Sequence, residues 1–299
     1  MGLLEKTKMK NLKFIFLLVG ALLLLVFWGK EKKGGENQIS QPTPTPTPTP
    51  QVVKESGFAA AIAEAEKREA EKRKEEENRQ FIAKYGPCRN IPILMYHHIG
   101  DKQNWLYVRP EIFRQQMDYL LEKGYTTVTL QEVVAALNSG TSLPEKPIVL
   151  TFDDGYRDFF TNAFPILRER NLKATVFVIT QLVDGEDYLT WEQLREIKGS
   201  GLITIGDHTL SHKDLAALPE EEIRSQILDA KNILENNLGG RIEVFAYPYG
   251  DSSSKVTKVL QEGGFLAAVR VSRGLACAKL PFSLPRIRIG NASLSSYGL

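Results

Sequence analysis

The sequence predicts an α/β fold, with a parallel sheet or barrel over the last two thirds of the chain. From about residue 87 onward, apolar runs of strand length alternate with amphipathic segments of helical length. Such alternation is typical of parallel strands covered by helices. This part of the chain holds about 210 residues, enough for seven or eight strand–helix units and near the lower limit for a closed barrel.

The strands and helices are expected in regular order. The helix over 110–123 places Ile112, Met117 and Leu120 on one face, and the helix over 219–238 starts with three glutamates and ends at Gly239-Gly240. The expected strands are 91–99, 125–129, 148–152, 174–179, 202–206, 242–247, 265–271 and 284–289. The other expected helices are 130–138, 163–170, 191–200 and 254–262.

Two adjacent carboxylates, Asp153 and Asp154, directly follow the apolar strand over 148–152. Neighbouring residues in a strand point to opposite faces, but the chain turns where a strand ends, and Gly155 permits that turn. Both carboxylates can therefore point into the mouth of a barrel, where active sites lie. The alternative is an ordinary Asp-Gly turn with two solvated side chains.

Two histidines, His208 and His212, follow the strand over 202–206. At this spacing they would share a face of one helical turn and could chelate one ion. One carboxylate and two imidazoles can hold a divalent metal and leave positions open for water and substrate. The second carboxylate is then free to act as a base, which indicates metal-assisted hydrolysis. Three nearby side chains could fix the imidazole tautomers, namely Asp207, Thr209 and Ser211.

Together with the segment 245–250, these motifs resemble the polysaccharide deacetylases of carbohydrate esterase family 4, also called the NodB homology domain. The resemblance covers about residues 87–291. Thr151–Asp154 matches the family's Thr-Phe-Asp-Asp motif, and His208–His212 matches its His-Ser/Thr-x-x-His motif. Three further segments look closest to the branch that deacetylates poly-N-acetylglucosamine, namely 95–98, 245–250 and 284–288.

The resemblance implies a distorted (β/α)7 barrel and a set of roles. It implies that Asp154, His208 and His212 bind a divalent ion, with Zn²⁺ expected and Co²⁺ or Ni²⁺ as alternatives. It further implies that Asp153 is the general base. The backbone N–H of Tyr249 would bind the oxyanion, and Pro248 with Tyr249 would form one wall of the sugar groove.

The chain departs from the family pattern at two places. Ala246 stands where the family usually has an arginine that orients the catalytic aspartate, and no histidine follows His212 to serve as the general acid. We expect Arg286, or else Arg288, to replace the arginine; both would share one face of the strand over 284–289. We expect the histidine pair at 97 and 98 to supply the acid or bind substrate, with His98 in catalysis and His97 at the substrate.

The N-terminal third predicts a tether. Residues 1–36 carry lysines before an uncharged run, 14–28, that is followed by no small-x-small cleavage site, which favours a membrane anchor over a cleaved signal. Residues 37–53 form a Pro/Thr-rich linker, and 54–86 a charged helical stalk rich in Ala, Glu, Lys and Arg. We expect residues 87–299 to be the catalytic domain, outside the cytoplasm, tethered to the cell membrane or secreted if the anchor is cleaved.

The net charge and the two cysteines limit the partners and the compartment that can be expected. The net charge is +2, of which residues 1–36 contribute seven lysines minus three glutamates, or +4, so the remainder sums to −2. We therefore expect no nucleic-acid partner, and we infer no obligate protein partner. Cys88 and Cys277 could form a disulfide outside the cytoplasm, or could remain two free thiols.

The expected function is a metal-dependent deacetylase of N-acetylated glycans such as poly-N-acetylglucosamine, peptidoglycan or chitin-like chains. An esterase that removes O-acetyl groups from xylan or a similar glycan is the first alternative, because an ester leaving group needs less help from an acid. A glycan-binding module without catalysis is the second.

Overall fold

The computed structural model describes residues 55–299, with side chains from residue 60 onward. The expected anchor (1–36) and linker (37–53) lie outside the described residues. Within the described part, no helix is both long and apolar enough to cross a membrane. The domain boundaries stay predictions.

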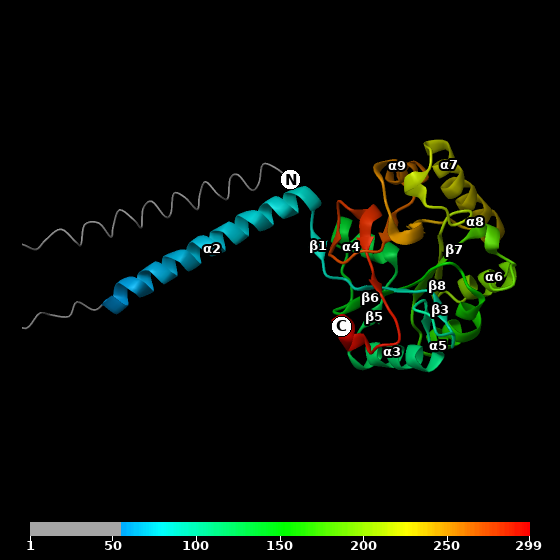
Figure 1. Ribbon diagram of the computed structural model, residues 1–299, viewed down its shortest axis with the longest axis horizontal. Coiled ribbons are helices and arrows are strands. Elements are labelled where there is room, and N and C mark those ends of the chain that lie inside the picture. The colour runs from blue at the N-terminus through cyan, green and yellow to red at the C-terminus, as the bar shows by residue number, and fades with distance from the viewer. Residues whose placement is uncertain (1–54) are drawn as a thin grey trace, which may run out of the picture. The chain divides into compact units, whose positions relative to one another are not determined.

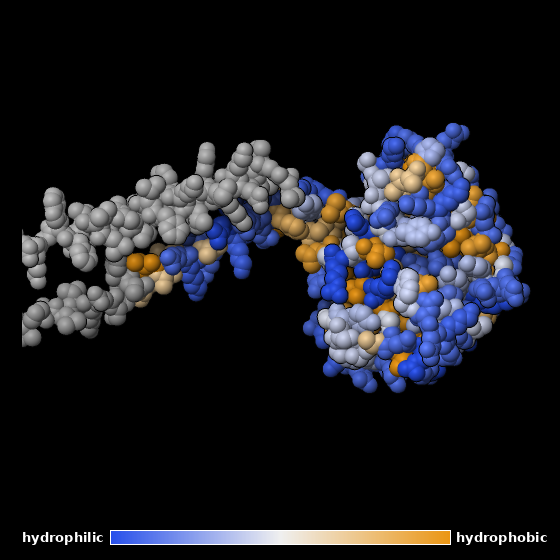
Figure 2. Space-filling view, in the orientation of Figure 1, coloured by the Kyte–Doolittle hydropathy of each residue, from blue (hydrophilic) through white to orange (hydrophobic). Residues whose placement is uncertain are grey.

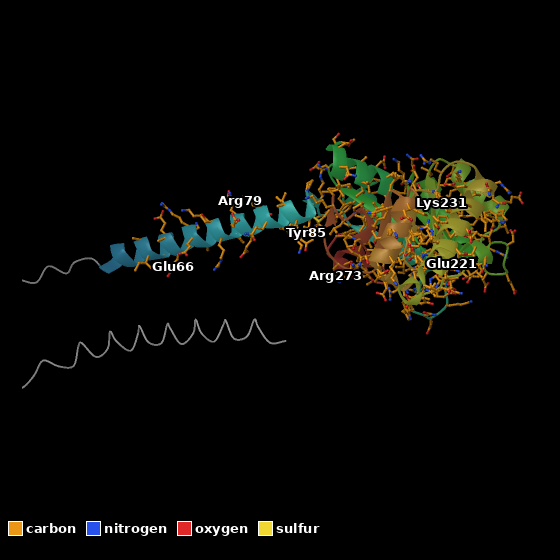
Figure 3. All side chains as sticks on the ribbon, turned by 90° about the horizontal axis from the view of Figure 1, so that it is seen from above. Glu66, Arg79, Tyr85, Glu221, Lys231 and Arg273 are labelled. Atoms are coloured by element: carbon orange, nitrogen blue, oxygen red, sulfur yellow. A yellow bond between two sulfur atoms is a disulfide. The ribbon has the colours of Figure 1, made fainter. Side chains whose placement is uncertain are left out.

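Helix α2 (Glu55–Tyr85) coincides with the segment expected to be helical. Its side chains are exposed from Ala60 to Lys84, and Figure 2 shows much of this helix in the blue of hydrophilic residues. Figure 3 shows charged side chains such as Glu66 and Arg79 projecting from it. Ion pairs at helical spacing, such as Arg68 with Glu64, support the helix.

A parallel, nearly closed, barrel-like sheet forms the centre of the fold. Its strand order is β12-β10-β9-β8-β7-β6-β2-β13, with β5 paired to β6, and its neighbouring strands are parallel. The strands at the two ends of this order, β12 (Leu284–Pro285) and β13 (Ile287–Arg288), are separated only by Arg286. One short segment therefore pairs with β10 on one side and with β2 on the other, which brings the sheet round on itself. The remaining strands are β2 (Ile93–Tyr96), β5 (Thr126–Thr127), β6 (Pro147–Phe152), β7 (Ala174–Val178), β8 (Ile203–Asp207), β9 (Val244–Ala246) and β10 (Ala267–Arg270).

Helices lie around this sheet, as Figure 1 shows. The helix expected over 219–238 is interrupted by one π-helical turn, Ser225–Asp229, and the strand expected over 91–99 is broken at His97 into β2 and β3 (His98–Ile99). Short pairings that were not expected are β3 with β4 (Tyr107–Val108) and β1 (Cys88–Arg89) with β11 (Ala276–Cys277). The helices are α3 (Pro110–Glu122), α4 (Leu130–Ser139), α5 (Phe164–Glu169), α6 (Trp191–Gly199), α7 (Glu220–Arg224), α8 (Ala230–Leu238) and α9 (Ser254–Glu262).

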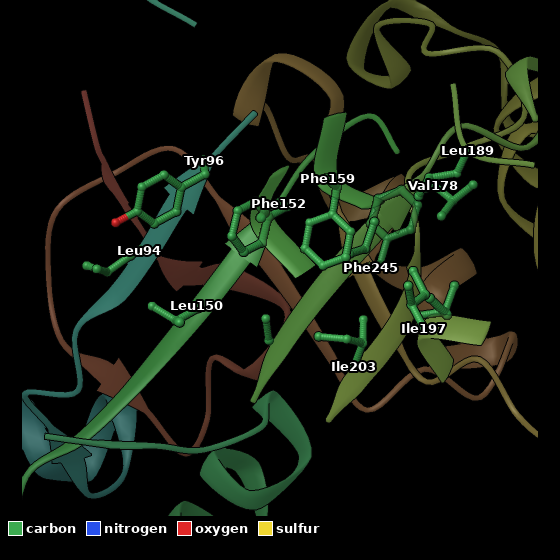
Figure 4. Close-up of a cluster of buried hydrophobic side chains, with 14 of the residues drawn as sticks. Leu94, Tyr96, Leu150, Phe152, Phe159, Val178, Leu189, Ile197, Ile203 and Phe245 are labelled. Carbon is green, nitrogen blue, oxygen red and sulfur yellow. The ribbon is translucent and has the colours of Figure 1, made fainter. Parts of the chain in front are cut away.

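The core consists of two hydrophobic clusters on opposite faces of the sheet. Successive strand residues alternate between them, as the pleat requires: Leu150 and Phe152 belong to the larger cluster, drawn in Figure 4, whereas Val149 belongs to the smaller one. The smaller cluster gathers residues from β2, β6, β7, β9, β10 and β12 with the apolar face of α4, so it lies on the inner face of the curved sheet. This alternation decides which polar residues at the strand ends continue the inner face.

Cys88 and Cys277 form a disulfide. They are direct register partners across the antiparallel pair β1–β11, so the bond joins the start of the folded domain to the segment that leads into β12. Free thiols, the alternative that the sequence left open, are therefore excluded for this structure.

Candidate active site

Asp153 continues the inner face of β6 and is clamped by an arginine. Its two carboxylate oxygens accept hydrogen bonds from Nη1 and Nη2 of Arg286, at 2.6 and 2.7 Å. Nη1 also donates to Oγ1 of Thr151, two residues before Asp153. Both partners are almost fully buried. The pair therefore has the bidentate geometry that fixes a carboxylate in one orientation.

Arg286 reaches this position because it lies between β12 and β13, where the sheet closes. The expectation that Arg286 and Arg288 share one face of the strand agrees with the structure, because Ile287 and Ile289 pack with the larger cluster on the opposite face. Arg286 is buried against Asp153, whereas Arg288 is exposed and places its guanidinium over the ring of Trp105. Arg286, and not Arg288, therefore orients Asp153.

The pKa of Asp153 reflects this pair. Burial alone would raise the pKa of the carboxyl, but the charge and hydrogen bonds of Arg286, together with the charge of His208, lower it below its ordinary value. Asp153 is therefore ionised near neutral pH and can accept a proton.

Asp154, His208 and His212 converge beside it. Oδ1 of Asp154 lies 3.3 Å from Nε2 of His208 and 3.5 Å from Nε2 of His212, and the three atoms lie within 4.8 Å of one another. This oxygen is buried and has no hydrogen-bond partner among the described residues. Burial raises the pKa of Asp154, but the nearby imidazoles, that of His208 above all, hold it well below its usual range.

This arrangement fits a divalent cation. Ligands about 2.0–2.1 Å from a tetrahedral zinc ion are roughly 3.3 Å apart, close to the two oxygen–nitrogen separations. The donor set of one carboxylate and two imidazoles also suits zinc and neighbouring transition metals. An unpartnered, buried carboxylate oxygen that faces two imidazole nitrogens is explained by such an ion.

The two histidines do not share a helical turn, contrary to the expectation from their spacing. The segment after β8 is a loop in which Thr209 and His212 have left-handed backbones, with φ of 70° and 59°. Oγ1 of Thr209 accepts the backbone N–H of His212 and stabilises the turn. Tight loop geometry, and not helical periodicity, therefore brings both rings to Asp154.

The tautomer of His208 is set by a residue that the sequence did not indicate for this role. Its Nδ1 lies 2.8 Å from the carbonyl oxygen of Ala246 in β9, so Nδ1–H donates there and Nε2 faces Asp154. Asp207 instead accepts the backbone N–H of Thr209, and Ser211 donates to Gln226. The proposed role of these three neighbours in fixing the imidazoles is thus wrong, except that Thr209 shapes the loop.

His97 and His98 have opposite surroundings. His97 directly follows β2, on the side of the strand that faces the inner cluster. Burial lowers its pKa, and the negative charges of Asp153 and Asp154 offset only part of that shift. His98 is stacked between Tyr107 and Tyr156, with ring centroids 4.0 and 3.5 Å away. Its Nδ1 lies 2.6 Å from Oδ2 of Asp158. This geometry favours His97 over His98 as the histidine that meets substrate chemistry.

Tyr249 stands beside the cluster. Its backbone is left-handed, with φ of 60°, its side chain is exposed, and its ring lies 4.9 Å from that of His212. Pro248, just before it, is buried. A tight turn after β9 therefore presents the Tyr249 ring next to the metal-binding residues.

Comparison with known proteins agrees with this geometry. The family model described as polysaccharide deacetylase matches residues 140–268. YxkH of Bacillus subtilis, which carries the name of a polysaccharide deacetylase, is 30% identical over 235 residues, covering 78% of this chain and 84% of its own. This chain belongs to the polysaccharide deacetylase family. It is therefore an enzyme, a hydrolase of carbohydrate esterase family 4.

Solved structures resemble the deacetylase along most of its folded part. The deacetylase PplD of Streptococcus pyogenes, solved in complex with acetate, superposes with a TM-score of 0.66 at 33% identity, covering 71% of this chain and 97% of that one. IcaB from Ammonifex degensii gives a TM-score of 0.62 at 29% identity, covering 67% and 91%.

A curated relative from Escherichia coli (strain K12) is a poly-beta-1,6-N-acetyl-D-glucosamine N-deacetylase. It is 29% identical over 250 residues, which cover 69% of this chain. The deacetylase spans only 37% of the length of that relative. The family model ends before Arg286 and begins after His97, so the roles of those two residues rest on the geometry above.

Proposed function

We propose that this deacetylase removes N-acetyl groups from N-acetylglucosamine-containing polysaccharide of the poly-N-acetylglucosamine type. The observation that carries the proposal is the buried Asp153–Arg286 pair set directly beside the cluster of Asp154, His208 and His212. Similarity to the Escherichia coli poly-beta-1,6-N-acetyl-D-glucosamine N-deacetylase supports the substrate class. We also propose that the segment 284–288 counts as the seventh strand of a distorted (β/α)7 barrel.

Asp153 acts as the general base. Arg286 keeps its carboxylate ionised and aimed, so it can accept a proton from the water that attacks the acetamide carbonyl. Asp154, His208 and His212 would hold the divalent cation, with Zn²⁺ as the preferred ion and Co²⁺ or Ni²⁺ as alternatives. When bound, that cation supplies Lewis-acid polarisation of the carbonyl and a lower pKa for the attacking water.

His97, in its imidazolium form, delivers the proton to the leaving amine nitrogen and is left neutral. It lies on the inner side of the β2 end, within the field of both aspartates, whereas His98 is held by two tyrosine rings and Asp158. We therefore move the catalytic role that the sequence suggested for His98 to His97. The backbone N–H of Tyr249 stabilises the developing oxyanion, and its side chain with Pro248 forms one wall of the sugar groove.

We further propose that the enzyme works outside the cytoplasm, anchored by residues 1–36 or secreted. The disulfide between Cys88 and Cys277 supports this location, because structural disulfides persist in oxidising compartments.

Acetate release tests the function. The full chain, reconstituted with Zn²⁺, is assayed on β-1,6- and β-1,4-linked N-acetylglucosamine pentamers and on O-acetylated xylan, beside Asp153→Asn. We expect release from the β-1,6 pentamer, abolished in the variant. Release from xylan alone would replace the proposal with an O-acetyl esterase, and preference for the β-1,4 pentamer would move the substrate to chitin-like or peptidoglycan chains.

A further inference from the structure

Trp105 is an indole that the fold holds largely exposed beside the active site. It lies in the loop 100–106 between β3 and β4, with 63% of its surface exposed. Its ring centroid is 6.3 Å from that of His97, in an edge-on arrangement. A large apolar ring exposed next to a catalytic histidine indicates a surface that a ligand covers.

The ring is held in place by its surroundings. The guanidinium of Arg288 in β13 lies 4.3 Å from the ring centroid, in a cation–π contact. Two hydrogen bonds hold Leu106, the residue after the indole: its carbonyl accepts the backbone N–H of His98, and its own N–H donates to Oδ1 of Asn104. Because β13 pairs with β2, Arg288, Trp105 and His97 gather at the same end of β2. The indole is thus positioned before any ligand arrives, which limits the entropy lost on binding.

We propose that Trp105, supported by Arg288, is a sugar-stacking subsite that binds a pyranose ring next to the one being deacetylated. The inference rests on the proposed function, because it assigns this surface to the same glycan. A pyranose has one face of C–H groups that packs on an indole, while its hydroxyls remain free to meet polar groups. Arg288 offers hydrogen-bond donors at the rim of that surface.

Position relative to Tyr249 argues for a polymer as the ligand. Tyr249, 67% exposed, touches His212, whereas Trp105 touches His97. The two rings are the most exposed of the large hydrophobic side chains in the described residues, and each contacts a different histidine of the site. A glycan that bound at both would cross the metal-binding residues and reach beyond the reacting sugar.

Substrates of different length distinguish a sugar-binding role of Trp105 from a catalytic role. For the β-1,6 pentamer, we expect Trp105→Ala to lower kcat/KM roughly threefold to tenfold. The loss should come from a higher KM, with little change in kcat. For the single-sugar substrate N-acetylglucosamine we expect no change, since the neighbouring sugar is absent. Trp105→Phe should retain most of the pentamer activity. Phe81→Ala, which removes an exposed ring from α2, is the matched control and should behave as wild type.

Two outcomes would overturn the inference: a pentamer KM within twofold of wild type in Trp105→Ala, or a loss of kcat that is equal for the pentamer and the single sugar. Calorimetric binding of the pentamer to Asp153→Asn, with and without Trp105→Ala, separates the inference from the function. If wild type released acetate from no N-acetylglucosamine substrate, the proposed function would fail. Pentamer binding that still depended on Trp105 would then support the subsite alone, and binding independent of Trp105 would refute it.

Discussion

Replacing Arg286 by methionine tests the central pair of the site. The substitution removes two hydrogen bonds of 2.6 and 2.7 Å to a carboxylate that is almost fully buried. Hydrogen bonds to charged groups contribute about 1.5–3 kcal/mol each, and breaking a buried ion pair costs about 3–5 kcal/mol because the remaining charge is uncompensated. We therefore expect Arg286→Met to lower the free energy of unfolding by about 3 kcal/mol or more.

Catalysis should suffer as well, because Asp153 loses the group that orients it. A catalytic group displaced by about 1 Å can lose about 100-fold in rate, and we expect kcat to fall by about that factor. Arg286→Lys keeps the charge but not the two parallel hydrogen bonds, so it should recover only part of the loss. The assays are urea unfolding of the metal-free protein and acetate release from the pentamer with saturating Zn²⁺.

A matched control is Arg224→Met. Arg224 also pairs with a carboxylate, that of Glu262, but the pair is exposed and such pairs contribute about 0–1 kcal/mol. Its kcat and stability should stay close to wild type. The reasoning is refuted if Arg286→Met, folded and loaded with Zn²⁺, keeps a kcat within threefold of wild type.

Three further predictions concern stability and metal. Reduction of the Cys88–Cys277 disulfide, whose cysteines are 189 residues apart, should lower the free energy of unfolding by about 2–5 kcal/mol, measured by urea denaturation with and without dithiothreitol; an unchanged midpoint would contradict this. Burial raises the pKa of Glu132, but Lys173 and the N-cap at Thr129 lower it below its ordinary 4.5. Its contribution is thus present above about pH 4.5 and lost as the pH falls through the lowered value. Glu132→Gln should lower Tm slightly at pH 7, by the equivalent of under about 1 kcal/mol, and this deficit should shrink as the pH falls below 4.5; a deficit that grows on acidification would refute it. Zn²⁺ at 100 times its Kd should stabilise the chelator-treated protein by about 2.7 kcal/mol, and Asp154→Asn should lose that shift in thermal unfolding.

Most helices and strands could be predicted from the local periodicity of apolar residues. The helix expected over 254–262 is α9 as observed, and the strand over 148–152 differs from β6 by one residue, because apolar pattern and capping act within each segment. The short pairs β1–β11 and β3–β4 were missed since two-residue strands depend on partners that are distant along the chain. The contact of the Ala246 carbonyl with His208 could not be predicted either, because a backbone group has no signature in the sequence.

The alternation of side chains along a strand could have predicted which of His97 and His98 faces the active site. Ile93 belongs to the inner cluster, so steps of two residues place Met95 and then His97 on the inner side, while His98 falls on the other side. The structure agrees: the aspartate charges act on His97, and His98 is packed between tyrosines. If this assignment is right, His97→Ala should reduce kcat for the N-acetyl pentamer strongly, whereas an activated ester, which needs no protonated leaving group, should be far less affected. His98→Asn should lower the two rates by the same factor, and a selective loss of amide hydrolysis in His98→Asn would reverse the assignment.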